Sequence, residues 1–405
     1  MRFRHKSRWA VAALGAVATL IPAGSAAVSA DNPDATTAMR TKLLGPGWNS
    51  PDVVRIKWIS VTTWLASFGG HVVLLDSTVM DALGEGDARA TAISLDDIIA
   101  AKPEYLYQNH VHLDQMRHAS RITAATGAKL VGGQPECDFA THDAALKGLA
   151  APTCVMVRDS SGKPFTGLDS YGSPVQPPIY TPWGAYGKPD EGPPGLDVTV
   201  VNIKHTQVRP YPGSLEGNEG YTGPDFTPYQ QSPPTPQSLT DFATTQYYEG
   251  GNLLYMFKWK GFTLIHHGSA GSLDPLEPGM SDVKASLRKL SDGKKPDVEI
   301  GGIAELQNYM NGMIDERRYA EEIGAKVFFP QHHGNWNPPV TSNATFYYQP
   351  WLQEMSKIDP ARRPQLCFVV EATRATAFSF TPSEWNGDAV GSITPLLGPG
   401  CYTGS

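Results

Sequence analysis

Residues 109–118 read NHVHLDQMRH and follow a short apolar and aromatic run, EYLYQ at 104–108. His110, His112 and Asp114 occupy alternating positions, so one extended turn can bring their side chains together. Imidazole and carboxylate groups in this arrangement are typical metal ligands. Gln115 differs, because an amide stands where a further histidine would complete a familiar histidine-rich pattern. The stretch predicts a metal site and leaves open how many metal ions it holds.

The other histidines share a position in the sequence pattern. Of the 11 histidines, eight fall in four short clusters, and each cluster ends an apolar, strand-like run. The clusters are His110, His112 and His118; His205; His266 and His267; and His332 and His333. Ligands gather at the C-terminal ends of strands in α/β proteins. One such histidine alone is more often structural, but four strand ends carrying histidine predict a shared metal site.

The strand and helix patterns predict an α/β fold. β-branched and aromatic runs indicate strands within 53–76, around a Gly69-Gly70 turn, and a hairpin at 252–267 with its turn at Lys260-Gly261. Helical patterns such as 95–101 alternate with these strands, which favours helices layered on sheets. Residues 159–240 are rich in Pro, Gly and Tyr. Because prolines at this density oppose regular ladders, we expect a loop-rich insertion there, interrupted by the strand that ends at His205.

The N-terminus predicts export. A basic start, an apolar stretch and small residues before Asp31 are typical of a secretory signal peptide over residues 1–30, cleaved after Ala30. Residues 31–405 are then expected to form a single domain. No later segment is long and apolar enough to span a bilayer, so we expect a secreted, extracellular protein without stable membrane association.

Charge and cysteines narrow the partners further. Residues 1–30 contain four basic residues and no acidic one, so their removal takes the formal net charge from −7 to −11. A chain of this charge is repelled by phosphate backbones, which disfavours nucleic acid and leaves a small-molecule substrate as the expected partner. The oligomeric state stays open. In an oxidising compartment the four cysteines favour two disulfides, and proximity suggests Cys137–Cys154 and Cys367–Cys401 among three possible pairings.

The ordered motifs resemble a known superfamily. NHVHLDQ is similar to the His-x-His-x-Asp-His signature of the metallo-β-lactamase superfamily, and His205, TLIHHGSAG at 263–271 and FFPQHHGNW at 328–336 follow in the matching order. They look most like the branch that contains L-ascorbate-6-phosphate lactonase. The resemblance covers most of residues 53–375 apart from the 159–240 loops. It implies a four-layer αββα sandwich with a Pro/Gly/Tyr-rich loop insertion.

The same resemblance assigns roles residue by residue. It implies a first metal site of His110, His112 and His205. The second site would use Asp114, position 115, position 269 and His332, but Gln115 and Ser269 stand at two of these positions and the usual bridging carboxylate is lost. Gln115 remains a candidate weak ligand, because an amide oxygen coordinates less strongly than imidazole or carboxylate. The candidate catalytic residues are Asp114 and His118. The candidates for orienting the ligands are Asp76, His266, His267, Ser269 and His333. Two alternatives stay open: His118, His266, His267 and His333 as substitute metal ligands, and Asp76 as a structural cap.

The resemblance also implies a reaction. We expect a secreted hydrolase in which a zinc-bound hydroxide attacks an ester, lactone or amide carbonyl while Asp114 orients or deprotonates the nucleophile. One zinc ion is expected, with a weaker second metal as an alternative and manganese or iron as alternative metals. The main alternative is a non-catalytic secreted binding protein that keeps the fold and at most one structural metal. A phosphodiesterase or nuclease fits the superfamily, but not the acidic charge or the missing carboxylate.

Overall fold

The computed structural model describes residues 33–79, 93–166, 182–205, 252–275, 279–291, 293–303, 313–332, 345–369, 377–397 and 400–403. Asp34–Ser405 group as one compact unit, separate from Met1–Pro33. The predicted signal peptide, residues 1–30, lies outside the described residues. Much of the predicted 159–240 insertion also does. None of the described helices is long and apolar enough to cross a membrane.

The first half of the chain builds one sheet with its helices. Three antiparallel strands come first: β1 (Val54–Ser60), β2 (Thr63–Phe68) and β3 (His71–Leu75). Three strands then extend the sheet, each parallel to the one before it: β4 (Tyr105–Tyr107), β5 (Lys129–Gly132) and β6 (Thr153–Asp159). The helices of this half are α1 (Pro33–Leu44), α2 (Leu95–Ala101), α3 (Leu113–Met116), α4 (Ala119–Thr126) and α5 (Gln134–Leu146). From the C-terminal end of the chain, β14 (Ala377–Phe380) pairs with β1, and β15 (Thr394–Pro395) pairs with β14.

The second half builds the other sheet. Its antiparallel strands are β7 (Tyr186–Pro189), β8 (Asp197–Ile203), β9 (Asn252–Trp259) and β10 (Phe262–His267). Its parallel strands are β11 (Val298–Gly302), β12 (Val327–Gln331) and β13 (Gln365–Leu366). Its helices are α7 (Met280–Leu290), α8 (Ile314–Ile323) and α9 (Thr345–Ser356), with a short 3₁₀ helix η3 (Pro382–Trp385) near the C-terminal end. β6 joins the two sheets, because it pairs with β5 on one side and β7 on the other.

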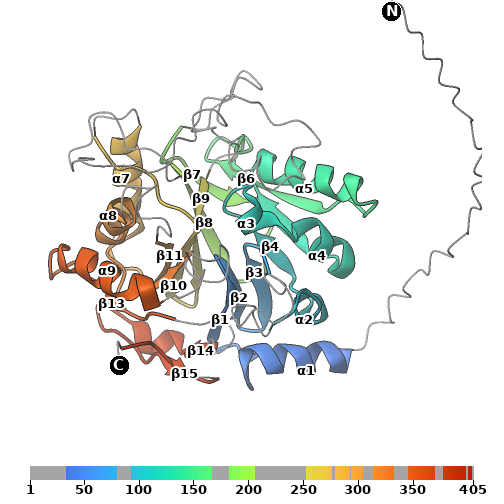
Figure 1. Cartoon of the computed structure of the whole chain (residues 1–405), viewed down its shortest axis with the longest axis horizontal. Coiled ribbons are helices and arrows are strands. Elements are labelled where there is room, and N and C mark those ends of the chain that lie inside the picture. Colours follow the sequence, from blue (N-terminus) through green and yellow to red (C-terminus); the bar gives the residue numbers. More distant parts are fainter. Residues whose placement is uncertain are drawn as a thin grey trace, which may run out of the picture. The chain divides into compact units, whose positions relative to one another are not determined.

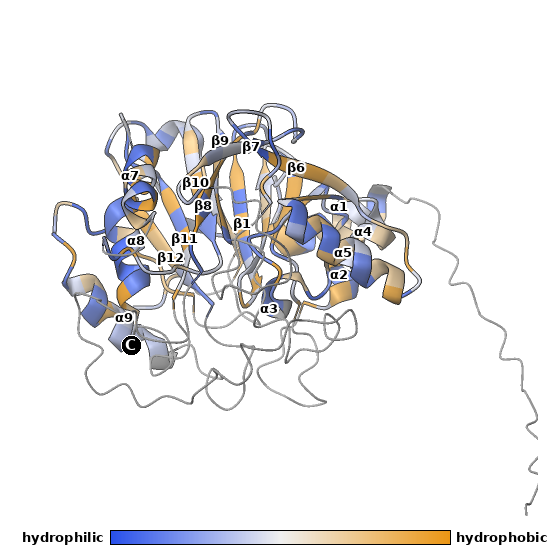
Figure 2. Ribbon diagram, turned by 90° about the horizontal axis from the view of Figure 1, so that it is seen from above, coloured by the Kyte–Doolittle hydropathy of each residue, from blue (hydrophilic) through white to orange (hydrophobic). Residues whose placement is uncertain are grey.

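Alternation along the strands creates the layers. In β3, Val73 and Leu75 enter the core between the two sheets, while Val72 and Leu74 enter the core shared with α1, α2, α4 and α5. In β10, Leu264 faces the inter-sheet core and Ile265 faces α7 and α8. Strands buried on both faces follow from this arrangement. Figures 1 and 2 show the same order, with strands between two groups of helices. The prediction of a four-layer αββα sandwich is confirmed.

Aromatic side chains hold the two sheets together. The Phe257 ring of β9 lies 5.5 Å from the Phe68 ring of β2 and 4.8 Å from the Tyr107 ring of β4, measured between centroids. A buried aromatic side chain of this size stabilises the folded state by about 1.5–3 kcal/mol relative to leaving it exposed. These contacts fix the spacing of the sheets, and with it the distance between loops at their edges.

Two tight turns confirm predictions from the sequence. β2 and β3 are joined at Gly69-Gly70, where both residues have positive φ (59° and 100°). A Cβ atom at Gly69 would lie 2.1 Å from the Trp259 ring, so glycine is required there by packing as well as by backbone conformation. Lys260 and Gly261 also have positive φ and join β9 to β10, as a two-residue hairpin turn of this kind demands.

Two expectations need correction. The sequence predicts that the loop-rich insertion at 159–240 is interrupted by one strand, which ends at His205, yet β7 also lies within it and pairs with β6 and β8. Pro189 ends this strand, a position where a missing N–H costs no ladder hydrogen bond. Of the two suggested disulfides, Cys367–Cys401 is present with a Cα–Cα distance of 4.8 Å, whereas Cys137 and Cys154 are free. These two thiols nevertheless meet between α5 and β6, and their hydrogen bond lowers the pKa of Cys154.

Candidate metal centre

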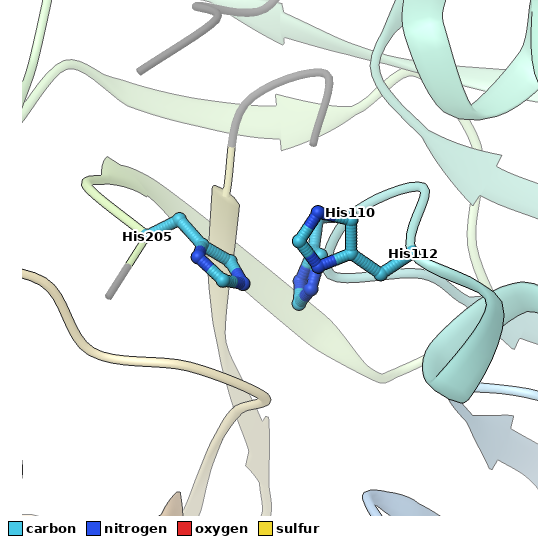
Figure 3. A group of neighbouring side chains, drawn as sticks. All are labelled: His110, His112 and His205. Carbon is cyan, nitrogen blue, oxygen red and sulfur yellow. The ribbon is translucent and has the colours of Figure 1, made fainter. Parts of the chain in front are cut away.

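Three histidines from separate parts of the chain form a triangle. His110 lies in the loop after β4, His112 directly precedes α3, and His205 follows β8. Each pair of ring centroids is 4.6 Å apart, and the interplanar angles are 75–82°. One nitrogen from each ring lies within 4.8 Å of the other two. Figure 3 shows the three rings turned toward one another. Among the described residues, this is the group of ionisable side chains close enough to share a metal ion.

Burial keeps the imidazoles of His110 and His112 neutral. Desolvation lowers the pKa of His110 well below its usual value, and the neighbouring His205 and His112 lower it further. Desolvation also lowers the pKa of His112 to about 4, although Asp114 opposes the shift. The His110 and His112 rings therefore offer lone pairs at neutral pH, and a dication is their natural partner. Both ring nitrogens of His110 and Nε2 of His112 are buried without a hydrogen-bond partner. Such unpaired buried nitrogens are costly unless something binds them, so the donor set fits a metal ion.

Asp76 supports the loop that carries His110. The Asn109 N–H donates to Asp76 Oδ1 at 2.9 Å, and Asp76 itself has φ 53°. Burial raises the pKa of Asp76 to about 8 even though the Asn109 N–H lowers it. On the other side of the loop, the Leu253 N–H donates to the Asn109 carbonyl at 2.8 Å. The loop is thus held from both sheets. Asp76 therefore contacts the residue directly before His110; its predicted role in orienting the ligands stays a prediction.

Asp114 and His332 form a pair next to the triangle. His332 Nε2 lies 2.9 Å from Asp114 Oδ2. Burial by itself would raise the pKa of Asp114, but the hydrogen bond and charge of His332, together with His112, lower it. His332 follows β12 with φ 62°, and its N–H donates to the Val61 carbonyl at 3.0 Å. The two residues kept from the predicted second site therefore lie together.

The two altered positions are both buried. Gln115 is fully buried, and both polar atoms of its amide lack a hydrogen-bond partner. Ser269 is 5% exposed, and its carbonyl accepts a hydrogen bond from Asn252 at 3.0 Å. Gly268 lies so close to the His110 loop that a Cβ there would be 3.1 Å from Asn109 Oδ1. The loop that carries Ser269 therefore packs against the loop that carries the first two histidines.

The remaining histidines have partners of their own. His266 Nε2 lies 3.1 Å from the Thr62 carbonyl and 3.2 Å from Gln331 Nε2, and burial lowers its pKa to about 3. His267 Nε2 lies 3.0 Å from Glu299 Oε1 in a fully buried pair. His118 Nδ1 accepts a hydrogen bond from the Val79 N–H at 3.1 Å. Its catalytic role stays a prediction. His333 lies outside the described residues.

Some supporting residues gave no signal in the sequence. Asn252 begins β9 far from any histidine motif, yet it contacts the loops of His205 and Ser269. Gln331 joins His266 to Trp64, whose Nε1 donates to Gln331 Oε1 at 2.6 Å. Asn109 was visible as the residue before His110, but its bonds to Leu253 were not. Tyr186, an aromatic of the predicted insertion, lines a surface cleft of about 630 Å³ that includes none of the site histidines.

Comparisons with known proteins found similarity among solved structures alone. No family model and no curated protein matches the sequence. The solved structures that it resembles are metallo-β-lactamase-fold proteins and metallo-hydrolases. A metallo hydrolase from Ignicoccus hospitalis is 14% identical, covers 81% of this chain and 99% of its own, and has a TM-score of 0.46. The metallo-β-lactamase fold protein YhfI from Bacillus subtilis is 9% identical, with coverage of 81% and 99% and a TM-score of 0.42.

A third similar structure shows a different chemistry. The diiron β-hydroxylase CmlA from Streptomyces venezuelae is 10% identical, with coverage of 81% of this chain and 54% of its own and a TM-score of 0.41. At these values the fold assignment for this chain rests on its own layers and sheet order. Its chemistry has to come from its own side chains.

Proposed function

We propose that the chain is a hydrolase that uses one zinc ion to cleave an ester, lactone or amide bond. The observation that carries the proposal is the triangle of His110, His112 and His205, whose buried rings face one another. Burial lowers the pKa of His110 and His112, so these two rings are neutral at neutral pH. Three imidazoles with one open position are the ligand set of many catalytic zinc sites. The Asp114–His332 pair beside them supplies a carboxylate near the reacting centre.

Each residue of the proposed site has a distinct role in the reaction. His110, His112 and His205 would hold the zinc ion, which would supply the Lewis acidity that lowers the pKa of a water molecule to near neutral. Asp114 orients the attacking water and accepts its proton at Oδ1, since Oδ2 is engaged by His332. His332 keeps the carboxylate in place and favours its ionised form. Asp76 and the Asn109 backbone fix the loop of the first two ligands.

Metal content tests the proposal directly. Mature protein purified without added metal should contain one zinc ion per chain by elemental analysis, and His112→Ala should contain far less. His71→Ala is the matched control, because His71 pairs with Glu104 elsewhere on the sheet. Wild-type protein that holds no metal after dialysis against zinc would contradict the hydrolase. A panel of chromogenic esters, lactones and β-lactams, assayed with wild type and His112→Ala, then identifies the bond that is cleaved.

A second candidate is a non-catalytic secreted binding protein that keeps the fold and at most one structural metal. The replacement of two second-site ligands by Gln115 and Ser269 favours it. The two candidates differ in one measurable respect. A binding protein would hold at most one zinc ion per chain and would turn over none of the panel substrates at any pH between 5 and 9.

Secretion is part of the proposal as well. The basic and apolar character of residues 1–30 supports it, and so does the Cys367–Cys401 disulfide, a bond typical of oxidising compartments. Expression of the full chain in a secreting host should release a product that begins at Asp31 by N-terminal sequencing. A product that keeps residues 1–30 inside the cell would contradict this localisation. The partner proposed is a small-molecule substrate, with no nucleic acid.

A further inference from the structure

Asn252 lies at the junction of the three loops that form the metal centre. It is the first residue of β9, pairs with Ile203 at the end of β8, and is fully buried. Its Nδ2 donates to the Lys204 carbonyl at 3.3 Å and to the Ser269 carbonyl at 3.0 Å. The next residue, Leu253, donates its N–H to the Asn109 carbonyl at 2.8 Å. Residues next to His205 and His110 and the loop of Ser269 therefore meet at this point.

The two carbonyl acceptors decide which way the amide points. A carbonyl oxygen can only accept, so the atom of Asn252 that contacts both must be the NH₂ group. The amide oxygen Oδ1 is then fixed on the other side, where it is buried without a formed hydrogen bond. An amide oxygen in this position needs a donor.

His110 is the donor that this oxygen lacks. Both ring nitrogens of His110 are buried and neither has a formed hydrogen bond. The two side chains are nevertheless close enough for the Asn252 amide to raise the pKa of His110 against the larger effect of burial. A neutral imidazole carries one N–H and one lone pair, and a metal takes the lone pair. The N–H that remains must point to an acceptor, and Asn252 Oδ1 is the buried acceptor beside it.

We propose that Asn252 is a positioning residue of the metal centre: its Oδ1 accepts the N–H of His110 and thereby fixes the tautomer and ring orientation in which His110 binds the metal. Its NH₂ group holds the loops of His205 and Ser269 together through hydrogen bonds to the Lys204 and Ser269 carbonyls. This inference rests on the proposed zinc site. Partners of this kind typically contribute a factor of 10–100 to metal affinity.

Two substitutions separate the acceptor from the bracing of the loops. Asn252→Leu removes the acceptor and the two donors, whereas Asn252→Asp removes the donors and keeps an acceptor at the same place. The loss of loop bracing is common to both, so their difference reports the bond to His110. We expect Asn252→Leu to bind zinc about 10–100-fold more weakly than wild type and Asn252→Asp to stay close to wild type. Competition with a chromogenic chelator gives these dissociation constants.

Spectroscopy and a matched control complete the test. Cobalt(II) in the wild type and Asn252→Asp should give the same visible absorption bands, and Asn252→Leu should shift them. Asn202→Leu is the control, since Asn202 is another buried asparagine on the neighbouring strand β8. It should lower the unfolding temperature of the metal-free protein without weakening zinc binding. Thermal unfolding of all variants in chelator separates misfolding from loss of metal.

The outcomes are distinct. Wild type that binds no zinc would end the proposed function. Wild type that binds zinc, together with an Asn252→Leu variant of equal affinity, would overturn the positioning role alone. So would equal weakening in the Leu and Asp variants, because the loops rather than the His110 bond would then explain the loss.

Discussion

Asp114 Oδ2 and His332 Nε2 lie 2.9 Å apart although 218 residues separate them in the chain. The contact joins the helix α3 to the loop after β12, and it turns the carboxylate that follows His112 into one with a fixed orientation. Because the pair is at the edge of the histidine triangle, its loss should affect catalysis more than folding.

Asp114→Ala should lower kcat on the identified substrate by about 10²–10⁴-fold, the usual contribution of a positioned acid or base. The loss of one hydrogen-bond partner should lower the free energy of unfolding by only about 1–3 kcal/mol. Glu104→Ala serves as the control, because Glu104 Oε2 pairs with His71 Nδ1 at the same 2.9 Å away from the triangle. Equal turnover in Asp114→Ala and wild type would remove Asp114 from the mechanism.

Metal removal should destabilise the chain. A ligand bound by the folded state alone stabilises it by about 2.7 kcal/mol when its concentration is 100 times Kd. Chelator should therefore lower the unfolding temperature of wild type, and added zinc should restore it. His205→Ala should show no such response, because it removes one corner of the triangle. If the unfolding temperature of wild type is the same with and without chelator, the protein does not hold a stabilising metal.

The altered second site can be tested by restoring it. Gln115→His together with Ser269→Asp should raise the metal content from one to two ions per chain, because Asp114 and His332 are already paired nearby. Gln115 is fully buried, and its amide has no hydrogen-bond partner. A histidine there would replace this unpaired polar group with a stronger metal ligand. Each single variant should stay at one ion. A double variant that also binds one would mean that the second site has lost more than two ligands.

The Cys367–Cys401 disulfide should stabilise the C-terminal part of the chain. It spans 34 positions, and a loop of that length corresponds to about 4 kcal/mol in the chain-entropy model. Cys401→Ser should lower the free energy of unfolding by an amount of that order. Reductant should lower the stability of wild type and leave that of the variant unchanged, as followed by urea titration. Wild type that is insensitive to reductant would contradict the bond.

Lys57 gives a pH dependence that is independent of the metal centre. Lys57 is 7% exposed on β1, and burial lowers its pKa from 10.5 to about 8. Between these values the unfolded chain binds more protons than the folded chain, so this residue makes stability rise with pH in that window. Below about pH 8 the full cost of the buried lysine is present.

Lys57→Met should remove that cost. At pH 7 the variant should be more stable than wild type, by at most about 3 kcal/mol from the size of the shift. The gain should shrink as pH rises from 8 toward 10.5 and vanish above it. Urea titrations of both proteins at pH 7 and pH 10 measure the difference. A gain that is the same at both pH values would show that packing rather than charge explains it.

Local patterns in the sequence account for most of the described architecture. Runs of β-branched and aromatic residues predicted β1–β3 and the β9–β10 hairpin. The turns lie at the predicted glycines, Gly69-Gly70 and Lys260-Gly261, where the backbone has positive φ. The strand β7 escaped prediction, because a four-residue strand inside a Pro- and Gly-rich segment depends on its neighbours β6 and β8 rather than on its own residues.

Part of the metal centre could likewise be predicted from the sequence, and part of it could not. The sequence by itself determined that histidines end the strand-like runs, because residue type and periodicity are local properties. The resemblance of the ordered motifs already grouped His110, His112 and His205, and these three meet in the structure. Only the tertiary structure decided that His266 and His267 turn to Thr62 and Glu299, because those partners lie on other strands and loops. Asn252 carries no local signature at all, because its role comes from three loops that meet only when the two sheets pack.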